Sequence, residues 1–268
     1  MLKEAPAAKH ATRNVKQLFD LTGRVAIVTG GSIGLGYQMA EGLAEMGANL
    51  VLCARKKQRC EEAAGEFRQF GVKALPLVCD VRNPAQIQEV IDEAFSQLGR
   101  IDVLVNNAGS SWGAPAEEMR LEDWNKVIET NLTGTFLFAQ GVGKKMIQQG
   151  RGKIINIASV AGLQGAPSQL DAIGYHASKG GVVSFTKDLA CKWAKHNIQV
   201  NAIAPGWFPT HMSNLVLEHH REFFLERIPL RRFGGEHDLK GAVVFLASDA
   251  SDYVTGHVLV VDGGQSAW

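Results

Sequence analysis

The sequence predicts an α/β fold, in which a doubly wound parallel sheet of seven strands carries helices on both faces. Short apolar runs that suit buried strands alternate in strict succession with segments of helical periodicity from residue 24 onward. A glycine-rich turn, from Gly30 to Gly36, follows the first apolar run and opens the first helical segment. Right-handed crossovers between successive parallel strands then distribute the helices over both faces of the sheet.

Composition narrows the class of protein further. The chain has 268 residues, of which 46% are hydrophobic and 21% charged, as in a soluble globular protein with a sizeable core. A net charge of +1 gives no indication of nucleic-acid or anionic-membrane binding. No apolar run approaches the ~20 residues that span a bilayer, and no signal peptide is recognisable. We predict a cytoplasmic protein with a flexible polar arm at residues 1–20 and one domain at residues 21–268.

The expected strands are short, rich in branched residues and closed by turn residues. They cover residues 24–29, 49–53, 73–78, 101–105, 153–158, 198–203 and 257–261. The helices that we expect between them cover residues 34–46, about 55–70, 84–98, 121–149 and 174–195. The third of these has a strong start signal, with Asn83 as cap, Pro84 in the first helical position and Gln86 two residues later.

Two features interrupt or accompany this alternation. Residues 207–235 are longer than an ordinary connection, which favours a lid over a binding site, with a plain surface helix as the alternative. The four cysteines, by contrast, show neither C-x-x-C pairing nor histidines at metal-ligand spacing. We therefore expect buried free thiols, a reducing compartment and no metal site for Cys53, Cys60, Cys79 and Cys191.

The glycine turn has the features of a phosphate-binding loop. Glycines in the spacing G-x-x-x-G-x-G allow a tight turn and a close approach of a pyrophosphate, and the following helix supplies N–H donors. A purely structural turn remains the alternative. The residues that we expect to contact a dinucleotide here are Gly30, Ser32, Ile33, Gly34 and Gly36.

Tyr175 and Lys179 carry the strongest chemical signal. Four residues apart on a helix, they share one face, with Cβ atoms about 5–6 Å apart. A neighbouring ammonium favours the charged form of a phenol and lowers its pKa, so the phenol can exchange a proton with an alcohol or ketone. Because this spacing also arises by chance on ordinary helices, its weight depends on the surrounding motifs.

Those motifs occur at the ends of the expected strands and in the long helix. Asn106-Asn107-Ala108-Gly109 closes the fourth strand, Ser159 follows the fifth, and Pro205-Gly206 ends the sixth. Asn131 lies within the long helix at residues 121–149, where it lowers helix propensity. Small residues at the strand ends leave room for a ligand at the topological switch point.

In this order, the segments from about Leu21 to the closing Val260-Val261-Asp262-Gly263-Gly264 resemble the short-chain dehydrogenase/reductase family, which has a Rossmann-type fold. The resemblance implies a catalytic tetrad of Asn131, Ser159, Tyr175 and Lys179. Tyr175 would be the general acid/base and Ser159 would hold the substrate oxygen. Lys179 would lower the pKa of Tyr175 and bind the nicotinamide ribose, and Asn131 would hold a relay water. The resemblance also implies that the protein is a homotetramer or homodimer.

The same resemblance implies a nicotinamide cofactor. At the end of the second strand, where NAD-preferring members carry an acidic residue, this chain has Ala54 followed by Arg55-Lys56, which suits a 2′-phosphate. Ile33 stands where many NADP-preferring relatives have a basic residue. We therefore predict NADP over NAD. The further cofactor contacts implied are Asp80, Val81, Asn107, Ala108, Gly109, Tyr175, Lys179, Pro205, Gly206, Phe208 and Thr210.

The substrate that the resemblance implies is a small secondary alcohol or ketone. The lead-in at residues 18–23 and the terminal Ala267-Trp268 are similar to the gluconate 5-dehydrogenase branch and the 3-oxoacyl-carrier-protein reductases. A sugar acid such as gluconate is one expected substrate, and a flat or cyclic apolar alcohol fits the expected mix of aromatic and polar pocket residues no worse. One alternative is a 3-oxoacyl thioester, for which Arg231-Arg232 is the only indication, and another is a non-catalytic dinucleotide sensor or scaffold. The expected substrate-binding residues are Ser111, Trp112, Ser159, Tyr175, Trp207 and His211.

Overall fold

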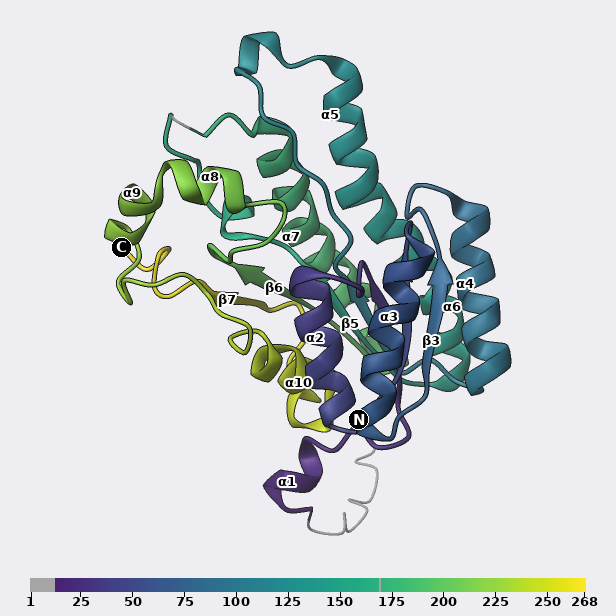
Figure 1. Ribbon diagram of the computed structural model, residues 1–268. Helices are drawn as coiled ribbons and strands as arrows, with labels where there is room; N and C mark the ends of the chain where they lie inside the picture. The colour runs from purple at the N-terminus through teal and green to yellow at the C-terminus, as the bar shows by residue number, and fades with distance from the viewer. Residues whose placement is uncertain (1–12, 169) are drawn as a thin grey trace, which may run out of the picture.

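The computed structural model describes residues 13–168 and 170–268. Seven parallel strands form one sheet in the order β3-β2-β1-β4-β5-β6-β7 (Figure 1). The predicted doubly wound α/β fold is thereby confirmed. The strands are β1 (Val25–Thr29), β2 (Asn49–Ala54), β3 (Ala74–Val78), β4 (Val103–Asn106), β5 (Gly152–Ile157), β6 (Ile198–Pro205) and β7 (Val258–Val261).

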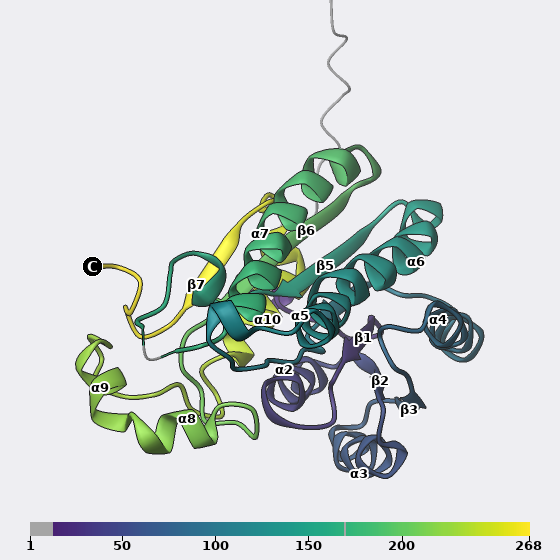
Figure 2. The same cartoon turned by 90° about the horizontal axis from the view of Figure 1, so that it is seen from above.

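Helices cover both faces of the sheet, as Figure 2 shows from above. The helices are α1 (Val15–Leu18), α2 (Gly34–Glu45), α3 (Lys57–Phe67), α4 (Pro84–Leu98), α5 (Leu121–Ile128), α6 (Gly134–Gln149), α7 (Ile173–Trp193), α8 (Asn214–His219), α9 (Arg221–Glu226) and α10 (Lys240–Ala247). Helices α2, α3 and α10 bury their apolar residues in one core cluster, whereas α4, α6 and α7 bury theirs in another. Strand residues alternate between the two clusters, since Ala26 and Val28 join the first and Val25 and Ile27 the second.

The start of α4 positions a loop at the site. Asn83 caps the helix by accepting hydrogen bonds from the backbone N–H groups of Ala85 (3.0 Å) and Gln86 (3.3 Å). The side chain of Gln86 does not reach back to Asn83 as a capping box requires. Its Oε1 accepts from the backbone N–H of Asp80 at 2.8 Å and so fixes the turn after β3.

The single long helix expected at residues 121–149 is wrong, because a π-helical turn at Glu129–Thr133 separates α5 from α6. This wider turn places Asn131 inside, with an exposed fraction of 1%. Gly134 follows the turn and packs on Val81, whose backbone oxygen would lie 2.9 Å from any added Cβ. Inserted π turns are frequent at functional sites.

The structure also bears on the expectations for residues 207–235, for the cysteines and for membrane-spanning helices. Residues 207–235 contain two short helices, α8 and α9, rather than one surface helix. Cys53, Cys60 and Cys79 are buried free thiols as expected, but Cys191 is exposed on α7 because its helix position faces away from the sheet. The part of the arm at residues 1–12 lies outside the described residues. Within the described part of the chain, no helix combines the length and apolarity that crossing a bilayer requires.

Candidate active site

A large cavity of about 1130 Å³ opens at the carboxyl ends of the strands. It runs from the glycine turn and the ends of β2 and β3, past the ends of β4 and β5, to the segment at residues 207–227. Every cofactor-binding and substrate-binding residue expected from the sequence lines this cavity, except Gly36. Of the expected tetrad, Ser159, Tyr175 and Lys179 line it, whereas Asn131 lies behind its wall.

The glycine turn is locked to the end of β4 by Asn107. The side-chain Nδ2 of Asn107 donates to the backbone oxygens of Thr29 (2.9 Å) and Gly30 (3.3 Å). A Cβ at Gly36 would lie 2.4 Å from that nitrogen, so Gly36 is needed for packing rather than for ligand contact. Helix α2 has no side-chain cap at its N-terminus, which leaves the N–H groups of its first turn for an anion. This donor set fits a dinucleotide pyrophosphate.

Ser159 is positioned by the turn that it caps. Its Oγ accepts from the backbone N–H of Ala161 at 3.1 Å, so the hydroxyl hydrogen is free to donate. The turn packs directly on α7, because a Cβ at Gly162 would lie 2.6 Å from the backbone oxygen of Lys179. Burial raises the pKa of Tyr175 above its ordinary value, while a hydrogen bond with the Ser159 side chain acts in the opposite direction. Ser159 and Tyr175 therefore face the cavity as a pair.

Lys179 is a buried cation with an exposed fraction of 4%. Its Nζ donates to the backbone oxygen of Ile157 at 2.6 Å and lies 5.6 Å from the centroid of the Tyr175 ring. It makes no ion pair with any described residue, and burial lowers its pKa to about 8. Burial is the largest influence on the pKa of Tyr175 and raises it, so the lowering of that pKa by Lys179 stays a prediction.

Asn131 connects the loop after β4 to α7. Its Oδ1 accepts from the backbone N–H of Ser110 at 2.7 Å, and its Nδ2 donates to the backbone oxygen of Ser110 and to Ser178 Oγ, both at 2.9 Å. An added Cβ at Gly109 would lie 3.4 Å from Asn131 Oδ1 and 3.9 Å from Lys179 Nζ. Asn131 thus fixes the part of the cavity wall beside Lys179. Both hydrogens of its amide nitrogen are already used in hydrogen bonds.

The end of the cavity near β2 is basic. Arg55, Lys56 and Arg59 line it, and none of them forms an ion pair within the described residues. Asp80 is held by Arg82, whose guanidinium lies 2.6 Å away and keeps the pKa of that carboxyl low. Sequence reasoning missed Arg59, which reaches the cavity from the first turn of α3.

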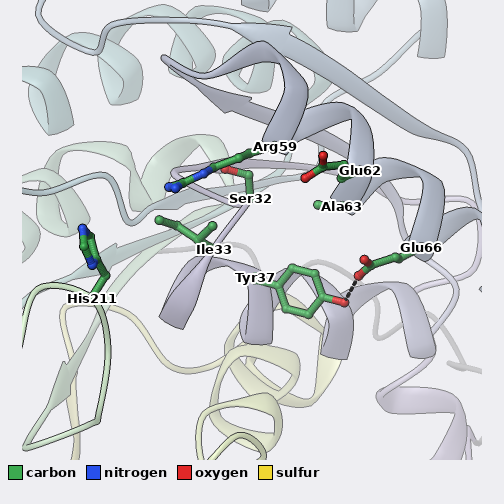
Figure 3. Close-up of a pocket in the computed structure, with 8 residues that line it drawn as sticks. All are labelled: Ser32, Ile33, Tyr37, Arg59, Glu62, Ala63, Glu66 and His211. Carbon is green, nitrogen blue, oxygen red and sulfur yellow. Dashed lines mark hydrogen bonds between the residues drawn. The ribbon is translucent and has the colours of Figure 1, made fainter. Parts of the chain in front are cut away.

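A smaller hollow of about 400 Å³ adjoins this basic end (Figure 3). Arg59 extends over Ser32 and Ile33, away from Glu62 and Glu66, and His211 faces it from the other side. The Glu66 carboxylate is hydrogen-bonded by the Tyr37 hydroxyl, which turns it away from Arg59. The guanidinium of Arg59 is therefore available to an anion at Ser32.

The opposite end of the cavity is aromatic. The rings of Trp207 and Phe224 lie 4.3 Å apart between centroids, and Lys126 Nζ lies 5.3 Å from the centroid of Trp112. The segment between Ser159 and Tyr175 forms part of the wall, with residue 169 outside the described part. Further lining residues that sequence reasoning did not select are Lys126, Thr130, His176, Val216, Arg227 and Gln265. Among these residues, only His176 could have been suspected from the sequence, because it directly follows Tyr175.

Comparisons with known proteins agree with this geometry. A family model described as "Enoyl-(Acyl carrier protein) reductase" matches residues 30–266. Gluconate 5-dehydrogenase of Gluconobacter oxydans is 40% identical over 249 residues, which cover 92% of this chain and 96% of that protein. The 3-oxoacyl-acyl-carrier-protein reductase of Thermotoga maritima is 41% identical over 244 residues, covering 91% and 98%.

A solved structure extends the comparison to three dimensions. The gluconate 5-dehydrogenase of Burkholderia cenocepacia, in complex with NADP and tartrate, superposes with a TM-score of 0.91. It is 39% identical and covers 95% of this chain and 100% of its own. These relatives are enzymes, which gives no support to the alternative of a non-catalytic sensor. The chain belongs to the short-chain dehydrogenase/reductase family and is an NAD(P)-dependent oxidoreductase that interconverts a secondary alcohol and a ketone.

Proposed function

We propose that this enzyme uses NADP(H) to interconvert a secondary alcohol and a ketone on a sugar acid such as gluconate. The observation that carries the proposal is the meeting of Ser159, Tyr175 and the buried Lys179 in one cavity with the glycine turn. The names of the relatives support the substrate class, since gluconate 5-dehydrogenase and 2-dehydro-3-deoxy-D-gluconate 5-dehydrogenase are among them.

The proton chemistry follows from the chain's own groups. A bound nicotinamide would supply or accept the hydride. Tyr175, whose pKa is raised by burial, holds its proton at neutral pH and can donate it to a carbonyl oxygen during reduction. Ser159 donates a hydrogen bond to the same oxygen. We expect reduction to predominate near neutral pH and alcohol oxidation to accelerate as the pH rises.

Lys179 and Asn131 would support Tyr175 in different ways. Lys179, whose pKa lies at about 8, would stabilise the negative charge that develops on the phenol. It would also bind a hydroxyl of the nicotinamide ribose. The side chain of Asn131 is engaged by Ser110 and Ser178, so we propose it as a positioning residue. A relay water at Asn131 would have to use the backbone carbonyl, which already accepts from Thr135 Oγ1 at 2.7 Å.

The preference for NADP is supported by the charges near the end of β2. Arg55, Lys56 and Arg59 line the cavity there, whereas Ala54 offers no carboxylate to a ribose hydroxyl. Many NADP-preferring relatives have a basic residue at the position of Ile33, and Arg59 would supply that positive charge in this chain. Three solved structures of relatives contain NADP, which supports the same cofactor here.

A 3-oxoacyl thioester remains the second candidate, because reductases of that class are among the relatives. The residues thought to favour it give little support. Arg232 pairs with Asp238 at 2.9 Å, Arg231 bonds backbone oxygens, and neither lines the cavity.

Steady-state kinetics decide between the two substrates. The reduction of 5-ketogluconate and of acetoacetyl-coenzyme A should be followed with NADPH and, separately, with NADH. We expect kcat/KM to be at least about tenfold higher for 5-ketogluconate and for NADPH, which corresponds to about 1.4 kcal/mol. A higher kcat/KM for the thioester would replace the sugar-acid proposal by the alternative.

We further propose a cytoplasmic dimer or tetramer in which residues 207–235 close over the bound substrate. Phe136 on α6 is 42% exposed and packs edge-to-face on Phe185 of α7, with ring centroids 6.2 Å apart. An exposed phenylalanine that packs on a partly buried one from a second long helix suits a subunit contact. Sedimentation velocity of the wild type and of Phe136→Asp would test it, with monomers expected for the variant.

A further inference from the structure

Arg227 presents a positive charge to the aromatic end of the cavity. It directly follows α9, and its guanidinium lies 3.6 Å from the centroid of the Phe223 ring. Its Nη1 also donates to the backbone oxygen of Phe223 at 3.1 Å, so two contacts fix its direction. Arg227 lines the cavity and, within residues 13–168 and 170–268, has no carboxylate partner. Its remaining N–H donors are available to a ligand.

The C-terminal tail lies beside this arginine. The indole nitrogen of Trp268 donates to the backbone oxygen of Arg227 at 3.3 Å, and a Cβ at Gly264 would lie 3.0 Å from Pro229. Asp262 holds the tail in place by accepting from the backbone N–H groups of Gly264 (2.9 Å) and Ser266 (2.7 Å). Figure 1 shows the C-terminus next to α9. The tail and the end of α9 therefore form one wall.

Gln265, in this tail, carries an unused acceptor. Its side chain lines the same cavity as Arg227, and its Oε1 is buried without a hydrogen-bond partner among the described residues. Leaving such an oxygen unpaired costs about 1–3 kcal/mol, which a ligand hydroxyl can recover once the side-chain amide turns toward the cavity. Arg227 and Gln265 thus offer a bidentate cation and a hydroxyl acceptor on two segments in contact.

We propose that Arg227 and Gln265 form a subsite for the 2-hydroxycarboxylate end of the substrate. The guanidinium fork of Arg227 binds the carboxylate, and Gln265 accepts a hydrogen bond from the adjacent hydroxyl. The subsite deepens the proposed sugar-acid function and rests on it for the identity of the substrate. It would let the enzyme select hydroxylated acids over neutral alcohols at a distance from Tyr175.

Binding of a matched pair of probes tests the subsite without turnover. Tartrate is a hydroxylated dicarboxylate, and threitol has the same carbon chain with neutral ends. Calorimetric titrations of the NADPH-bound wild type should give tighter binding of tartrate. Arg227→Gln should weaken tartrate binding at least about tenfold and leave the affinity for threitol unchanged. Gln265→Met should weaken the binding of both probes. Arg227→Lys should restore part of the tartrate affinity.

Arg221→Gln is the matched control, because Arg221 also lies over an aromatic ring (Phe233, 5.2 Å) in α9 but does not line the cavity. It should bind both probes as the wild type does. Thermal unfolding of each variant should give Tm values close to the wild type, which separates lost binding from lost folding. Equal affinity of the wild type for both probes, or an unchanged tartrate affinity in Arg227→Gln, would overturn the subsite.

Kinetics distinguish failure of the subsite from failure of the proposed function. With 5-ketogluconate as substrate, Arg227→Gln should raise KM about tenfold or more while kcat stays within about twofold. If the wild type reduces this ketone and Arg227→Gln has an unchanged KM, the subsite is wrong and the function stands. If the wild type does not reduce it but tartrate binding depends on Arg227, the function is wrong and the subsite stands.

Discussion

The two ends of the sheet treat buried charge in opposite ways. At the amino ends of the strands, Asp249 pairs with Arg24 and Arg151, each at 2.9 Å, and with Arg13. Lys153, which is 3% exposed, pairs there with Asp252 at 2.8 Å. At the carboxyl ends, Lys179 is about equally buried but, among the described residues, bonds only the backbone oxygen of Ile157. Pairing offsets the cost of burying a charge, whereas an unpaired buried charge keeps that cost and marks a candidate site.

The pKa values express the same difference. Burial alone would raise the pKa of Asp249, but its three arginines hold it at about 2. Burial lowers the pKa of Lys179 to about 8, with no carboxylate to oppose it. Folding thus favours the charged form of Asp249 at the amino end and disfavours that of Lys179 at the carboxyl end. Burial lowers the pKa of Lys153 as well, although its partner Asp252 acts in the opposite direction. The predictions below test this contrast, from the largest expected effect to the smallest.

Replacing Tyr175 by Phe should have the largest effect on the carboxyl end. General acid–base catalysis contributes 10²–10⁴-fold, so we expect kcat to fall by about 10³-fold. The affinity for NADPH, measured by fluorescence titration, should change by less than about twofold, since other residues would hold the phosphates. Retention of full turnover would show that the proton comes from another group.

Replacing Lys179 by Met should remove a destabilising charge. A pKa that falls from 10.5 to about 8 on folding corresponds to about 3 kcal/mol in favour of unfolding below pH 8. Between pH 8 and 10.5 the unfolded state binds more protons, so wild-type stability gains this amount as the pH rises. The stability advantage of the variant, measured by urea unfolding, should therefore shrink over that range. A constant difference would contradict the assignment.

Replacing Asp249 by Asn should weaken the amino end alone. A folded-state pKa near 2, below the ordinary 3.8, stabilises the protein above pH 3.8, and this is lost as the pH falls through 2. Allowing for the exposed Arg13, we expect a loss of about 1–2 kcal/mol at pH 7 and unchanged kcat. A large fall in kcat with normal stability would mean that this end is not purely structural.

Replacing Arg59 by Gln should have the smallest effect and should act on cofactor choice. We expect kcat/KM for NADPH to fall about fivefold, or about 1 kcal/mol, because an exposed cation contributes little. The value for NADH should not change. Lys57→Gln serves as control, since Lys57 pairs with Glu61 at 3.5 Å and does not line the cavity. Equal losses with both cofactors would argue against a 2′-phosphate contact.

The sequence was informative where structure follows from local pattern. Apolar runs and glycine stops predicted all seven strands, and the strand-end motifs predicted which residues would line one cavity. Local reasoning failed where tertiary packing decides. The spacing of Tyr175 and Lys179 suggested a lowered phenol pKa, but it gave no sign of the burial by distant segments that raises this pKa. Arg227 and Gln265 had no signal, because only the folded chain brings the tail to α9.

The interrupted helix is an intermediate case. Poor helix formers around Asn131 were visible in the sequence, yet they could not show that a π turn would result. The turn depends on contacts with Val81 and Ser178, which are distant in the chain. Weak propensity predicted where the helix departs from regularity, and tertiary contacts determined how.

The most direct test compares one variant from each end of the sheet. Lys179→Met and Asp249→Asn should be measured together at pH 7, for free energy of unfolding by urea titration and for turnover of the best ketone substrate. The account predicts opposite outcomes: Lys179→Met gains stability and loses at least about 10²-fold in kcat, whereas Asp249→Asn loses stability and keeps its kcat. If both variants lose stability and activity alike, the division between a structural end and a catalytic end is contradicted.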